Sequence, residues 1–420
     1  MSADSDAGPA RPRVVLGVGG GVAAYKACEL LRELTETGHQ VRVVPTAAAL
    51  RFVGAATFEA LSGQPVSAEV FHDVPEVAHV RLGRSADLVI VAPATADLLA
   101  RVAQGRADDL LTATLLTARC PVLMAPAMHT EMWQHPATVA NVALLRGRGT
   151  VVLEPATGRL TGADSGPGRL PDPAEIAALG TLLLERSDAL PRNLVGRHVL
   201  VSAGGTREPL DPVRFLGNRS SGKQGYALAR VAVQRGARVT LVTGHTAGLS
   251  APAAVDVVAV STAAQMHQAI TARAGGVDAV IMAAAVADFR PSSTAVTKIK
   301  KGADEPVAVP LSRNPDVLAD LVARRRSGEL AASTVLVGFA AETGDGAGDV
   351  LHHGRAKLAR KGCDLLVVNA VGVGGAFEVD TNNGWLLSAD GTDRVLEHGS
   401  KALLASRVLD AVSARLPTPQ

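Results

Sequence analysis

Two glycine-rich segments of this 420-residue chain carry residue types that suit phosphate binding. Residues 17–26 read Gly-Val-Gly-Gly-Gly-Val-Ala-Ala-Tyr-Lys, and residues 202–209 read Ser-Ala-Gly-Gly-Thr-Arg-Glu-Pro. Glycine lets the backbone turn sharply and brings amide N–H groups close to a phosphate at the start of a helix. Two such turns predict two phosphate-bearing ligands, and therefore two reactions on one polypeptide.

Further residues of the first half follow predicted strands at their C-terminal ends, where ligands bind in open α/β sheets. Residues 92–97 read Ala-Pro-Ala-Thr-Ala-Asp, and residues 124–133 read Met-Ala-Pro-Ala-Met-His-Thr-Glu-Met-Trp. The second predicted strand is followed by Thr46 and not by an acid that would hold an adenosine ribose. This disfavours NAD and favours a mononucleotide such as FMN.

The second half has its own residues of chemical interest. Residues 218–223 read Asn-Arg-Ser-Ser-Gly-Lys and predict a phosphate-binding loop that is not a Walker A pattern. Asp288 stands just past a predicted strand, where a single aspartate most often caps a helix. Lys298 begins the basic run Lys-Ile-Lys-Lys, which by itself is typical of a solvated loop.

The elements that must position these residues can be read from the apolar pattern. Short, nearly continuous apolar runs alternate with helical patterns, which is typical of parallel strands buried on both faces. The first half has predicted strands at 14–18, 41–45, 87–92, 121–125 and 150–153, with helices at 23–36 and 174–186. The second half has them at 198–202, 238–243, 279–283, 334–339 and 365–369, with a final helix at 401–414. Because crossovers are right-handed, we predict two Rossmann-like, doubly wound α/β domains.

Two stretches interrupt this alternation. Residues 155–173 are rich in Gly, Pro and Thr and are predicted to be irregular. Residues 377–380 and 385–387 are strand-like and flank Asn-Asn-Gly at 382–384. An Asn-Gly pair between two such runs predicts a β-hairpin with its turn at that pair.

Length and composition fit a protein of two domains. A chain of 420 residues is long for one core, and Pro191 and Asn193 mark the predicted linker. We therefore expect a disordered segment at 1–12, a first domain at 13–190 and a second at 191–420. A net charge of +2 and 3% aromatic residues indicate no general affinity for nucleic acid or anionic membranes.

Cysteine usage and the N-terminus indicate the compartment. The three cysteines form no Cys-x-x-Cys pair, which predicts neither a disulfide framework nor a structural zinc site. The first dozen residues lack the apolar core of a signal peptide, and no stretch is long enough to span a membrane. We expect a cytoplasmic protein.

Four segments of the first half, at 19–26, 78–82, 86–98 and 125–133, together resemble the flavin-dependent cysteine decarboxylases that act on 4′-phosphopantothenoylcysteine. The resemblance implies a flavodoxin-like, FMN-binding domain. It implies that His79, otherwise a lone histidine at the start of a helical pattern, is the active-site base. It also implies an active-site role for His129, substrate contacts from Met128, Asp164 and Arg169, and cofactor contacts from Gly20, Gly21, Thr46, Ala94 and Thr95.

Three positions depart from the pattern of that family. His129 stands where the family has the asparagine that orients the substrate carboxylate, and Asp108 stands where it usually has another asparagine. Gly162 replaces the acidic cysteine of a substrate-covering clamp at 160–169. A histidine can still donate a hydrogen bond to a carboxylate, whereas Gly162 cannot donate a proton. Either another acid serves, with Asp164 the nearest in sequence, or this half stops before CO2 release.

From about Leu194 onward the chain closely resembles phosphopantothenate–cysteine ligase. The resemblance implies that Asn218 holds the phosphopantothenate carboxyl group and the acyl-cytidylate formed from it. It implies that Lys298 neutralises charge on the CTP phosphates, which Mg²⁺ also offsets without a predicted metal-ligand cluster in the protein. The implied substrate contacts are Arg207, Ser220, Ser221 and Ala285, and the implied nucleotide contacts are Ala284, Asp288, Lys298, Pro315, Asp316, Val317, Leu318, Phe339, Lys357 and Lys361.

Together the two resemblances cover nearly the whole chain and imply the bacterial bifunctional family that serves coenzyme A biosynthesis. Such decarboxylases form trimers and such ligases form dimers, which implies a homo-oligomer and points to a dodecamer. Two alternatives stay open. One is a ligase whose first half is a non-decarboxylating, flavin-binding assembly module. The other, suggested only by the glycine turns, is an NAD(P)-linked oxidoreductase.

Overall fold

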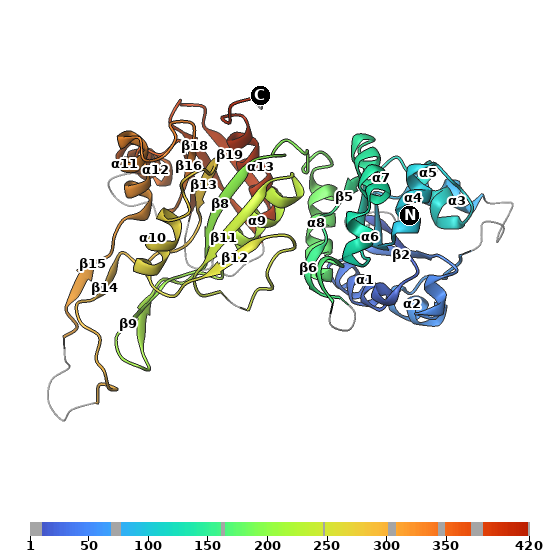
Figure 1. The fold of residues 1–420 in the computed structure, drawn as a ribbon, viewed down its shortest axis with the longest axis horizontal. Coiled ribbons are helices and arrows are strands. Elements are labelled where there is room, and N and C mark those ends of the chain that lie inside the picture. The colour runs from blue at the N-terminus through green and yellow to red at the C-terminus, as the bar shows by residue number, and fades with distance from the viewer. Residues whose placement is uncertain are drawn as a thin grey trace, which may run out of the picture. The chain divides into compact units, whose positions relative to one another are not determined.

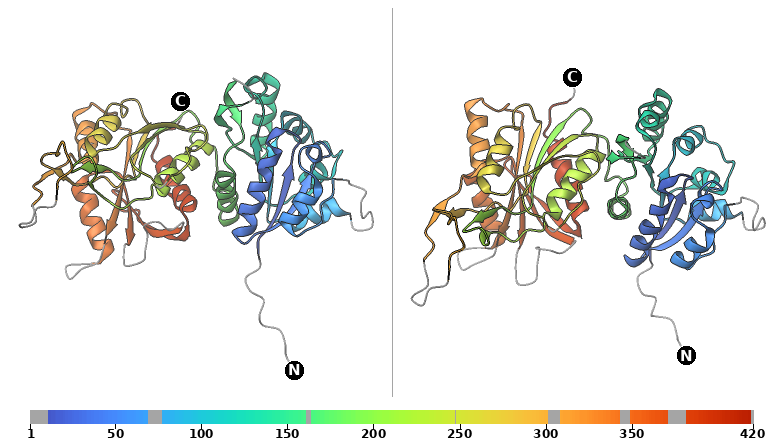
Figure 2. Two further views of the ribbon diagram at one scale, coloured as in Figure 1. Left: turned by 90° about the horizontal axis from the view of Figure 1, so that it is seen from below. Right: turned by 60° about the horizontal axis from the view of Figure 1, so that its bottom comes forward.

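The computed structural model describes residues 11–68, 77–160, 164–246, 248–300, 308–342, 349–370 and 381–418. It divides the chain into two compact units that meet in sequence at Leu190 and Pro191, with Pro252–Ala254 grouped with the first. Each unit has its own sheet with helices packed on it (Figures 1 and 2). The α/β class predicted for both halves is confirmed. The expected disordered segment 1–12 lies outside the described residues except for its last two.

The sheet of the first unit is entirely parallel. Its strands are β1 (Arg13–Val18), β2 (Gln40–Pro45), β3 (Leu88–Ala94), β4 (Val122–Pro126) and β5 (Val151–Val152). They lie in the order β2-β1-β3-β4-β5, which is the flavodoxin-like order. Every residue of β3 is buried, as expected for a parallel strand covered on both faces. In this order the ligand crevice lies at the C-terminal ends of β1 and β3.

Helices cover both faces of this sheet. On one face α1 (Lys26–Glu36) packs against α8 (Pro173–Glu185). On the other face α4 (Ala96–Ala103), α5 (Leu110–Thr117) and α7 (Pro136–Gly147) bury apolar residues in a core shared with the strands. The shorter elements are η1 (Val22–Tyr25), η2 (Ala49–Arg51), α2 (Ala55–Ser62), α3 (Ala78–Ser85) and α6 (Thr130–Gln134).

The sheet of the second unit is larger and mixed. Its strands are β8 (His198–Ala203), β11 (Arg238–Thr243), β12 (Asp256–Ala259), β13 (Ala279–Met282), β16 (Val335–Glu342), β17 (Leu365–Ala370), β18 (Thr381–Ser388) and β19 (Arg394–Ser400). The order is β12-β11-β8-β13-β16-β17-β18-β19. The first six strands are parallel and follow the Rossmann order, and β18 and β19 extend the sheet in antiparallel fashion.

Helices again cover both faces of the second sheet. On one face α9 (Lys223–Gln234) packs against α13 (Lys401–Ser413). On the other α10 (Ala263–Thr271), α11 (Val317–Ser327) and α12 (Val350–Lys361) share a core with the strands. The switch in strand order falls between β8 and β13, so the structure points to their C-terminal ends as the ligand-binding edge.

The hairpin turn predicted at 382–384 is wrong. Asn382, Asn383 and Gly384 lie inside β18, and the turn joins β18 to β19 at residues 389–393. The pairing of β18 with β19 shifts between Asn382 and Gly384, which marks a bulge. A Cβ on Gly384 would lie 2.1 Å from the carbonyl oxygen of Val368. Glycine is thus required here for close approach of two backbones and not for a turn. The partner run 377–380 lies outside the described residues.

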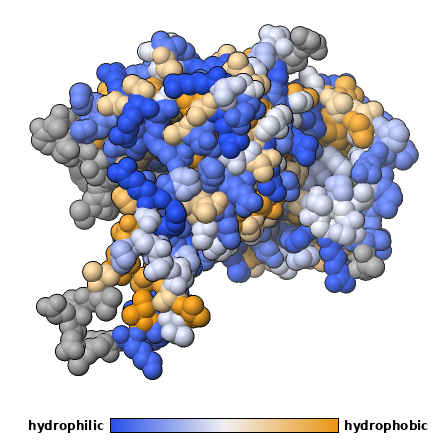
Figure 3. Space-filling view, turned by 60° about the vertical axis from the view of Figure 1, so that its left-hand side comes forward, coloured by the Kyte–Doolittle hydropathy of each residue, from blue (hydrophilic) through white to orange (hydrophobic). Residues whose placement is uncertain are grey.

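Three short antiparallel ribbons stand beside the main sheets. The stretch predicted to be irregular contains β6 (Ala156–Arg159) and β7 (Ser165–Arg169). The second unit contains β9 (Arg207–Pro209) paired with β10 (Phe215–Gly217), and β14 (Phe289–Pro291) paired with β15 (Leu311–Arg313). Apolar residues are exposed on the projecting part of this unit in Figure 3.

Candidate active sites

A cavity of about 1260 Å³ opens at the C-terminal edge of the first sheet, large enough for a flavin mononucleotide. Its wall brings together most of the residues implied for this half. They come from the glycine turn, from the ends of β2 and β3, from the segment after β4 and from β7. These lining residues are Gly20, Gly21, Thr46, Thr95, Met128, His129 and Arg169.

Close backbone approach shapes the glycine turn. The N–H of Gly19 donates to the carbonyl oxygen of Pro93 at 3.0 Å, and a Cβ on Gly19 would lie 2.4 Å from that oxygen. A Cβ on Gly20 would lie 2.4 Å from the Cβ of Ala48. Only glycine fits this cradle, so the turn can admit the phosphate of a mononucleotide close to its backbone.

Two threonine hydroxyls fix the neighbouring strand ends. Thr46 Oγ1 accepts a hydrogen bond from the N–H of Ala49 at 3.1 Å, and Thr95 Oγ1 accepts from Leu98 at 3.2 Å and caps α4. Ala94 is fully buried, and its carbonyl oxygen accepts from the N–H of Ala127 at 3.1 Å. Ala94 therefore supports the wall from behind, while both threonines line the cavity.

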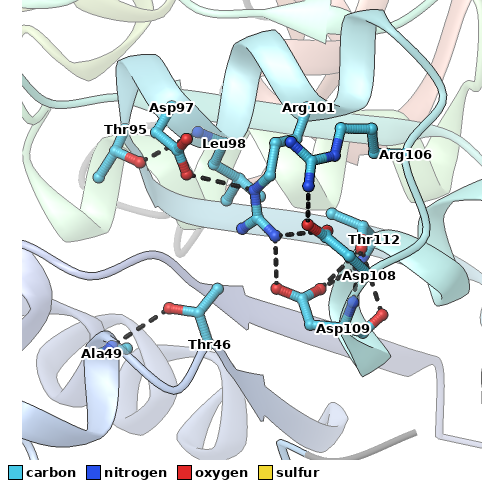
Figure 4. Close-up of polar contacts among 10 residues, drawn as sticks. All are labelled: Thr46, Ala49, Thr95, Asp97, Leu98, Arg101, Arg106, Asp108, Asp109 and Thr112. Carbon is cyan, nitrogen blue, oxygen red and sulfur yellow. Dashed lines mark hydrogen bonds and ion pairs between the residues drawn. The ribbon is translucent and has the colours of Figure 1, made fainter.

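Arg101 is a cavity residue that the sequence reasoning missed. Its Nη1 donates to Asp108 at 2.8 Å and to Asp109 at 2.9 Å, and its Nε lies 3.2 Å from Asp97 (Figure 4). The hydrogen bond from Arg101 holds the pKa of Asp108 below its usual value, so this carboxylate stays charged. In the sequence, the i, i+4 spacing of Asp97 and Arg101 indicates that these two side chains can form an ion pair on one helix face.

The ribbon of β6 and β7 docks on the segment that carries His129. The N–H of Met128 donates to the carbonyl oxygen of Gly168 at 2.9 Å, and Thr130 Oγ1 donates to that of Pro167 at 2.8 Å. A Cβ on Gly168 would lie 2.3 Å from the carbonyl oxygen of Met128. The clamp glycines therefore serve the contact between ribbon and site.

His129 and Asp164 face each other at the ribbon. His129 Nδ1 lies 4.0 Å from Asp164 Oδ2, and both side chains are exposed. The carbonyl oxygen of Asp164 accepts from the N–H of Leu160 at 2.8 Å, which joins the two sides of the clamp. Gly162, the position of the family cysteine, lies outside the described residues. The nearest acid to His129 is thus the one that the sequence singled out.

His79 lies on α3 and is not a lining residue of this cavity. Its Nδ1 is buried and has no hydrogen-bond partner within the described parts of the chain. Its carbonyl oxygen accepts from Thr117 Oγ1 of α5 at 2.8 Å. The fold of this unit therefore brings His129, Asp164 and Arg169 together but does not add His79 to them.

In the second unit, three segments meet at the switch between β8 and β13. The N–H of Ala285 donates to the carbonyl oxygen of Gly204 at 2.8 Å. Asn218 Nδ2 donates to the carbonyl oxygen of Val286 at 3.1 Å. Ser220 Oγ accepts from the N–H of Gly222 at 3.3 Å and so shapes the loop that precedes α9. The structure thus joins the glycine turn, the 218–222 loop and the segment after β13.

The remaining residues implied for this edge differ in their contacts and burial. The N–H of Ala284 donates to Ser202 Oγ at 3.1 Å, and Ser221 is half-buried in the same loop as Ser220. The guanidinium of Arg207 lies over the Phe215 ring, 4.2 Å from its centroid. Arg207 therefore stacks on its own ribbon, which is a contact that the sequence did not predict.

A second group surrounds the start of α11. Asp316 caps that helix by accepting from the N–H of Ala319 at 3.1 Å, and it also pairs with Lys361. Lys357 Nζ bonds to Glu342 at 2.8 Å. The two lysines are thus each paired with a carboxylate from a different element.

Other implied nucleotide residues lie around that group. Val317 and Leu318 are buried in the core, Phe339 is half-buried in β16 and Pro315 is exposed. The carbonyl oxygen of Asp288 accepts from the N–H of Asn314 at 2.8 Å. Asp288 thus bridges two segments and caps no helix. Lys298 lies in the connection between β14 and β15, where it is exposed and has no polar side-chain partner among the described residues.

Comparison with known proteins assigns both units. Residues 4–181 match the family model described as Flavoprotein, and residues 194–416 match that of the DNA/pantothenate metabolism flavoprotein C-terminal domain. The Coenzyme A biosynthesis bifunctional protein CoaBC of Mycobacterium tuberculosis is 69% identical over 95% of this chain and 96% of its own. That of Mycolicibacterium smegmatis is 68% identical over 97% and 98%, and that of Bacillus subtilis is 42% identical over 96% of both chains.

The chain belongs to the bifunctional coenzyme A biosynthesis family. Its first unit is a flavoprotein domain, which favours FMN over the alternative of an NAD(P)-linked oxidoreductase. Within the described ranges, no group of three or more His, Cys, Asp or Glu residues is arranged to hold a metal ion. No helix in the described part of this bifunctional protein is long and apolar enough to cross a membrane.

Proposed function

We propose that the second unit joins cysteine to 4′-phosphopantothenate with CTP and that the first unit decarboxylates the product to 4′-phosphopantetheine with FMN. The observation that carries this proposal is the presence of two separate candidate sites, each at the C-terminal ends of the parallel strands of its own sheet, in a chain of the bifunctional family. Ligation and decarboxylation share no chemistry, so each reaction has its own site.

In the proposed ligation, the substrate carboxylate attacks the α-phosphorus of CTP and expels pyrophosphate. The cysteine amine then attacks the acyl carbon and displaces CMP. Asn218, beside the segment after β13, is suited to hold the activated carboxyl group. The exposed ammonium of Lys298 would stabilise charge on the phosphates, with Mg²⁺ bound mainly through those phosphates.

Removing the Asn218 amide tests the ligase site. Asn218→Ala should abolish CTP-dependent amide formation, because it removes the amide that lies beside the segment after β13 and is proposed to hold the activated carboxyl group. The flavin should stay bound, since it belongs to the other unit. Asn193→Ala, an exposed amide at the linker, is the matched control and should ligate normally. Near-normal ligation by Asn218→Ala would refute this assignment.

In the proposed decarboxylation, FMN held at the glycine turn and the ends of β2 and β3 would supply the reversible hydride transfer that creates an electron sink for CO2 loss. The chain's own residues bind, orient and protonate. Arg169 and His129 would hold the substrate carboxylate, and Asp164 would deliver the proton that the family's cysteine supplies. The 4.0 Å separation of His129 and Asp164 supports this pairing.

Product analysis tests both halves at once. The purified protein, given 4′-phosphopantothenate, cysteine, CTP and Mg²⁺, should form 4′-phosphopantetheine and release CO2, as followed by mass. Accumulation of 4′-phosphopantothenoylcysteine would instead support the ligase with a non-decarboxylating flavin-binding module. Omission of Mg²⁺ should stop ligation, because the phosphates of CTP then lose the divalent cation that offsets most of their charge.

We also propose that the protein is a homo-oligomer. Exposed apolar side chains on the β9–β10 and β14–β15 ribbons, among them Phe215, Phe289 and Leu311, support association through the second unit. Light scattering on a sizing column gives the mass directly. A monomer at micromolar concentration would refute this part of the proposal.

A further inference from the structure

Asp211 makes more contacts than its turn requires. It lies between β9 and β10, and its Oδ1 accepts from the N–H groups of Val213 and Arg214, each at 2.8 Å. These two bonds suffice to form the turn. Its Oδ2 accepts in addition from Arg214, at 3.0 Å from Nε and 2.6 Å from Nη2. The side chain of Asp211 is completely inaccessible to solvent, whereas that of Arg214 is 47% exposed.

The same pair grips a distant piece of backbone. Asp211 Oδ2 accepts from the N–H of Ile299 at 3.2 Å, and Arg214 Nη2 donates to the carbonyl oxygen of Ile299 at 2.9 Å. Both backbone polar groups of Ile299 are therefore held by a charged pair 85 or more residues earlier in the chain. The hydrogen bonds from Arg214 hold the pKa of Asp211 well below its usual range, so the Asp211 carboxylate that accepts from Ile299 is ionised at neutral pH.

Lys298 is the immediate neighbour of that gripped residue. A second anchor precedes it, because the N–H of Ala295 donates to the carbonyl oxygen of Leu210 at 3.0 Å. Lys298 thus lies between two fixed points, yet its own side chain is exposed. A lysine reaches a phosphate through a flexible stem, so the position of its backbone decides where the charge can act.

We propose that Asp211 is a positioning residue of the ligase reaction: with Arg214 it clamps the backbone of Ile299 and thereby holds Lys298 at the nucleotide site. The inference rests on the proposed role of Lys298 in ligation. The side chain of Asp211 is inaccessible to solvent, so the proposal requires its effect on ligation to pass through Lys298. That requirement separates positioning from a purely structural role, which would act whether or not Lys298 is present.

Asp211→Asn in the full chain is the primary variant. Asparagine keeps one oxygen for the turn but places an NH2 group where Oδ2 accepted from Ile299 and Arg214. We expect the kcat of CTP-dependent ligation to fall roughly 10- to 100-fold, with a smaller change in KM for CTP, because a displaced cation no longer meets the charge that develops in the reaction. Asp390→Asn is the control, since Asp390 also caps a turn and pairs with an arginine, and it should ligate normally.

A double-variant cycle decides whether the effect passes through Lys298. In a Lys298→Gln background, Asp211→Asn should cause no further loss. Losses that multiply would overturn the proposal, as would an unchanged kcat for Asp211→Asn alone. If Lys298→Gln by itself ligates normally, the role proposed for Lys298 has failed, and that result is visible without any Asp211 variant.

Hydrogen exchange tests the clamp without relying on turnover. Asp211→Asn should remove the protection of about one amide in a peptide covering 292–300, namely that of Ile299, while the Ala295 amide keeps its backbone acceptor. Unchanged exchange would overturn the proposal. If Asp211→Asn does not fold, Asp211→Ser is used instead, because serine can still cap the turn but lacks the second oxygen.

Discussion

The charge of Asp108 at the cavity wall is compensated by two arginines. Asp108 replaces an uncharged asparagine of the decarboxylase pattern, which would add unpaired negative charge to the cavity wall. Arg101 and Arg106 both bond to it, at 2.8 and 2.6 Å, and so compensate that charge. The substitution is therefore compatible with a functional flavin site.

Loss of the Asp164 carboxyl group should separate flavin binding from CO2 release. In Asp164→Ala we expect the decarboxylation kcat to fall on the order of 100-fold, which is the lower end of the roughly 100- to 10,000-fold range that one general acid contributes. The flavin spectrum should not change, because Asp164 is not among the residues that line the cavity.

The control for that variant is Glu131→Gln. Glu131 is an exposed acid two positions from His129, and it does not line the cavity. Stopped-flow measurement of CO2 release from 4′-phosphopantothenoylcysteine distinguishes the two variants. Equal rates in both would show that Asp164 is not the proton donor and would turn attention to His129.

Among the elements, the sheets provide rigid edges and the short ribbons provide the covering parts of each site. The β6–β7 ribbon rests on the residues after β4, and residues 209–214 of the β9–β10 ribbon hold the loop that carries Lys298. Each ribbon is too short to be stable by itself. Its order must come from hydrogen bonds to the neighbouring segments, which is why single glycines and single carboxylates matter there.

The start of β8 carries a pH-dependent contribution to stability. Partial burial, and then the charge of Arg238, lower the pKa of His198 below the ordinary value of 6.5. The folded state therefore binds fewer protons here than the unfolded state. This contribution is fully present above about pH 6.5 and is lost as pH falls toward the folded pKa.

Comparison of the wild type with His198→Gln isolates this contribution. Glutamine can retain a hydrogen bond to Thr240 Oγ1, which lies 3.0 Å from His198 Nε2, but it does not titrate. Between pH 7.5 and 5 the melting temperature of the second unit should fall further in the wild type than in the variant, as measured by calorimetry. Parallel curves for the two proteins would contradict the assignment.

For the whole molecule, two units with separate sheets and cores mean that one site can be removed while the other persists. Gly19→Ala is suited to this, because the new Cβ would lie 2.4 Å from the backbone oxygen of Pro93, which cannot move aside easily. We expect a colourless protein that still ligates, so that 4′-phosphopantothenoylcysteine accumulates. Absorbance at the flavin band and product mass are the two readouts.

Gly54→Ala is the matched control for Gly19→Ala. A Cβ at Gly54 meets nothing within 4 Å, and its φ of −67° suits any residue. This variant should stay yellow and complete both reactions. If the Gly19→Ala protein keeps its flavin, the glycine turn does not hold the flavin phosphate as proposed. If it loses ligation while its second unit is still folded, the two units do not act independently.

Much of the fold and part of each site were predictable from local sequence. The strands at 14–18 and 238–243 are confirmed within a residue, because an apolar run buried on both faces has the same signature in any context. The Asn-Gly pair in β18 was misread, because a glycine required for a turn and one required by a neighbouring strand look alike in sequence. The role of Arg101 was missed because Arg101 lies on α4, whereas its partners Asp108 and Asp109 lie at the start of α5.

The two α/β halves, the glycine turns and the residue types available for flavin and nucleotide chemistry could thus be read from local sequence. These depend on steric freedom and hydrophobic periodicity, which act within a few residues. Which groups meet depends on the folded chain: His79 lies outside the cavity lined by His129, Lys361 pairs with Asp316, and Asp211 holds Ile299. Such contacts join segments far apart in the chain, and they exist only once the sheets have set the path between them.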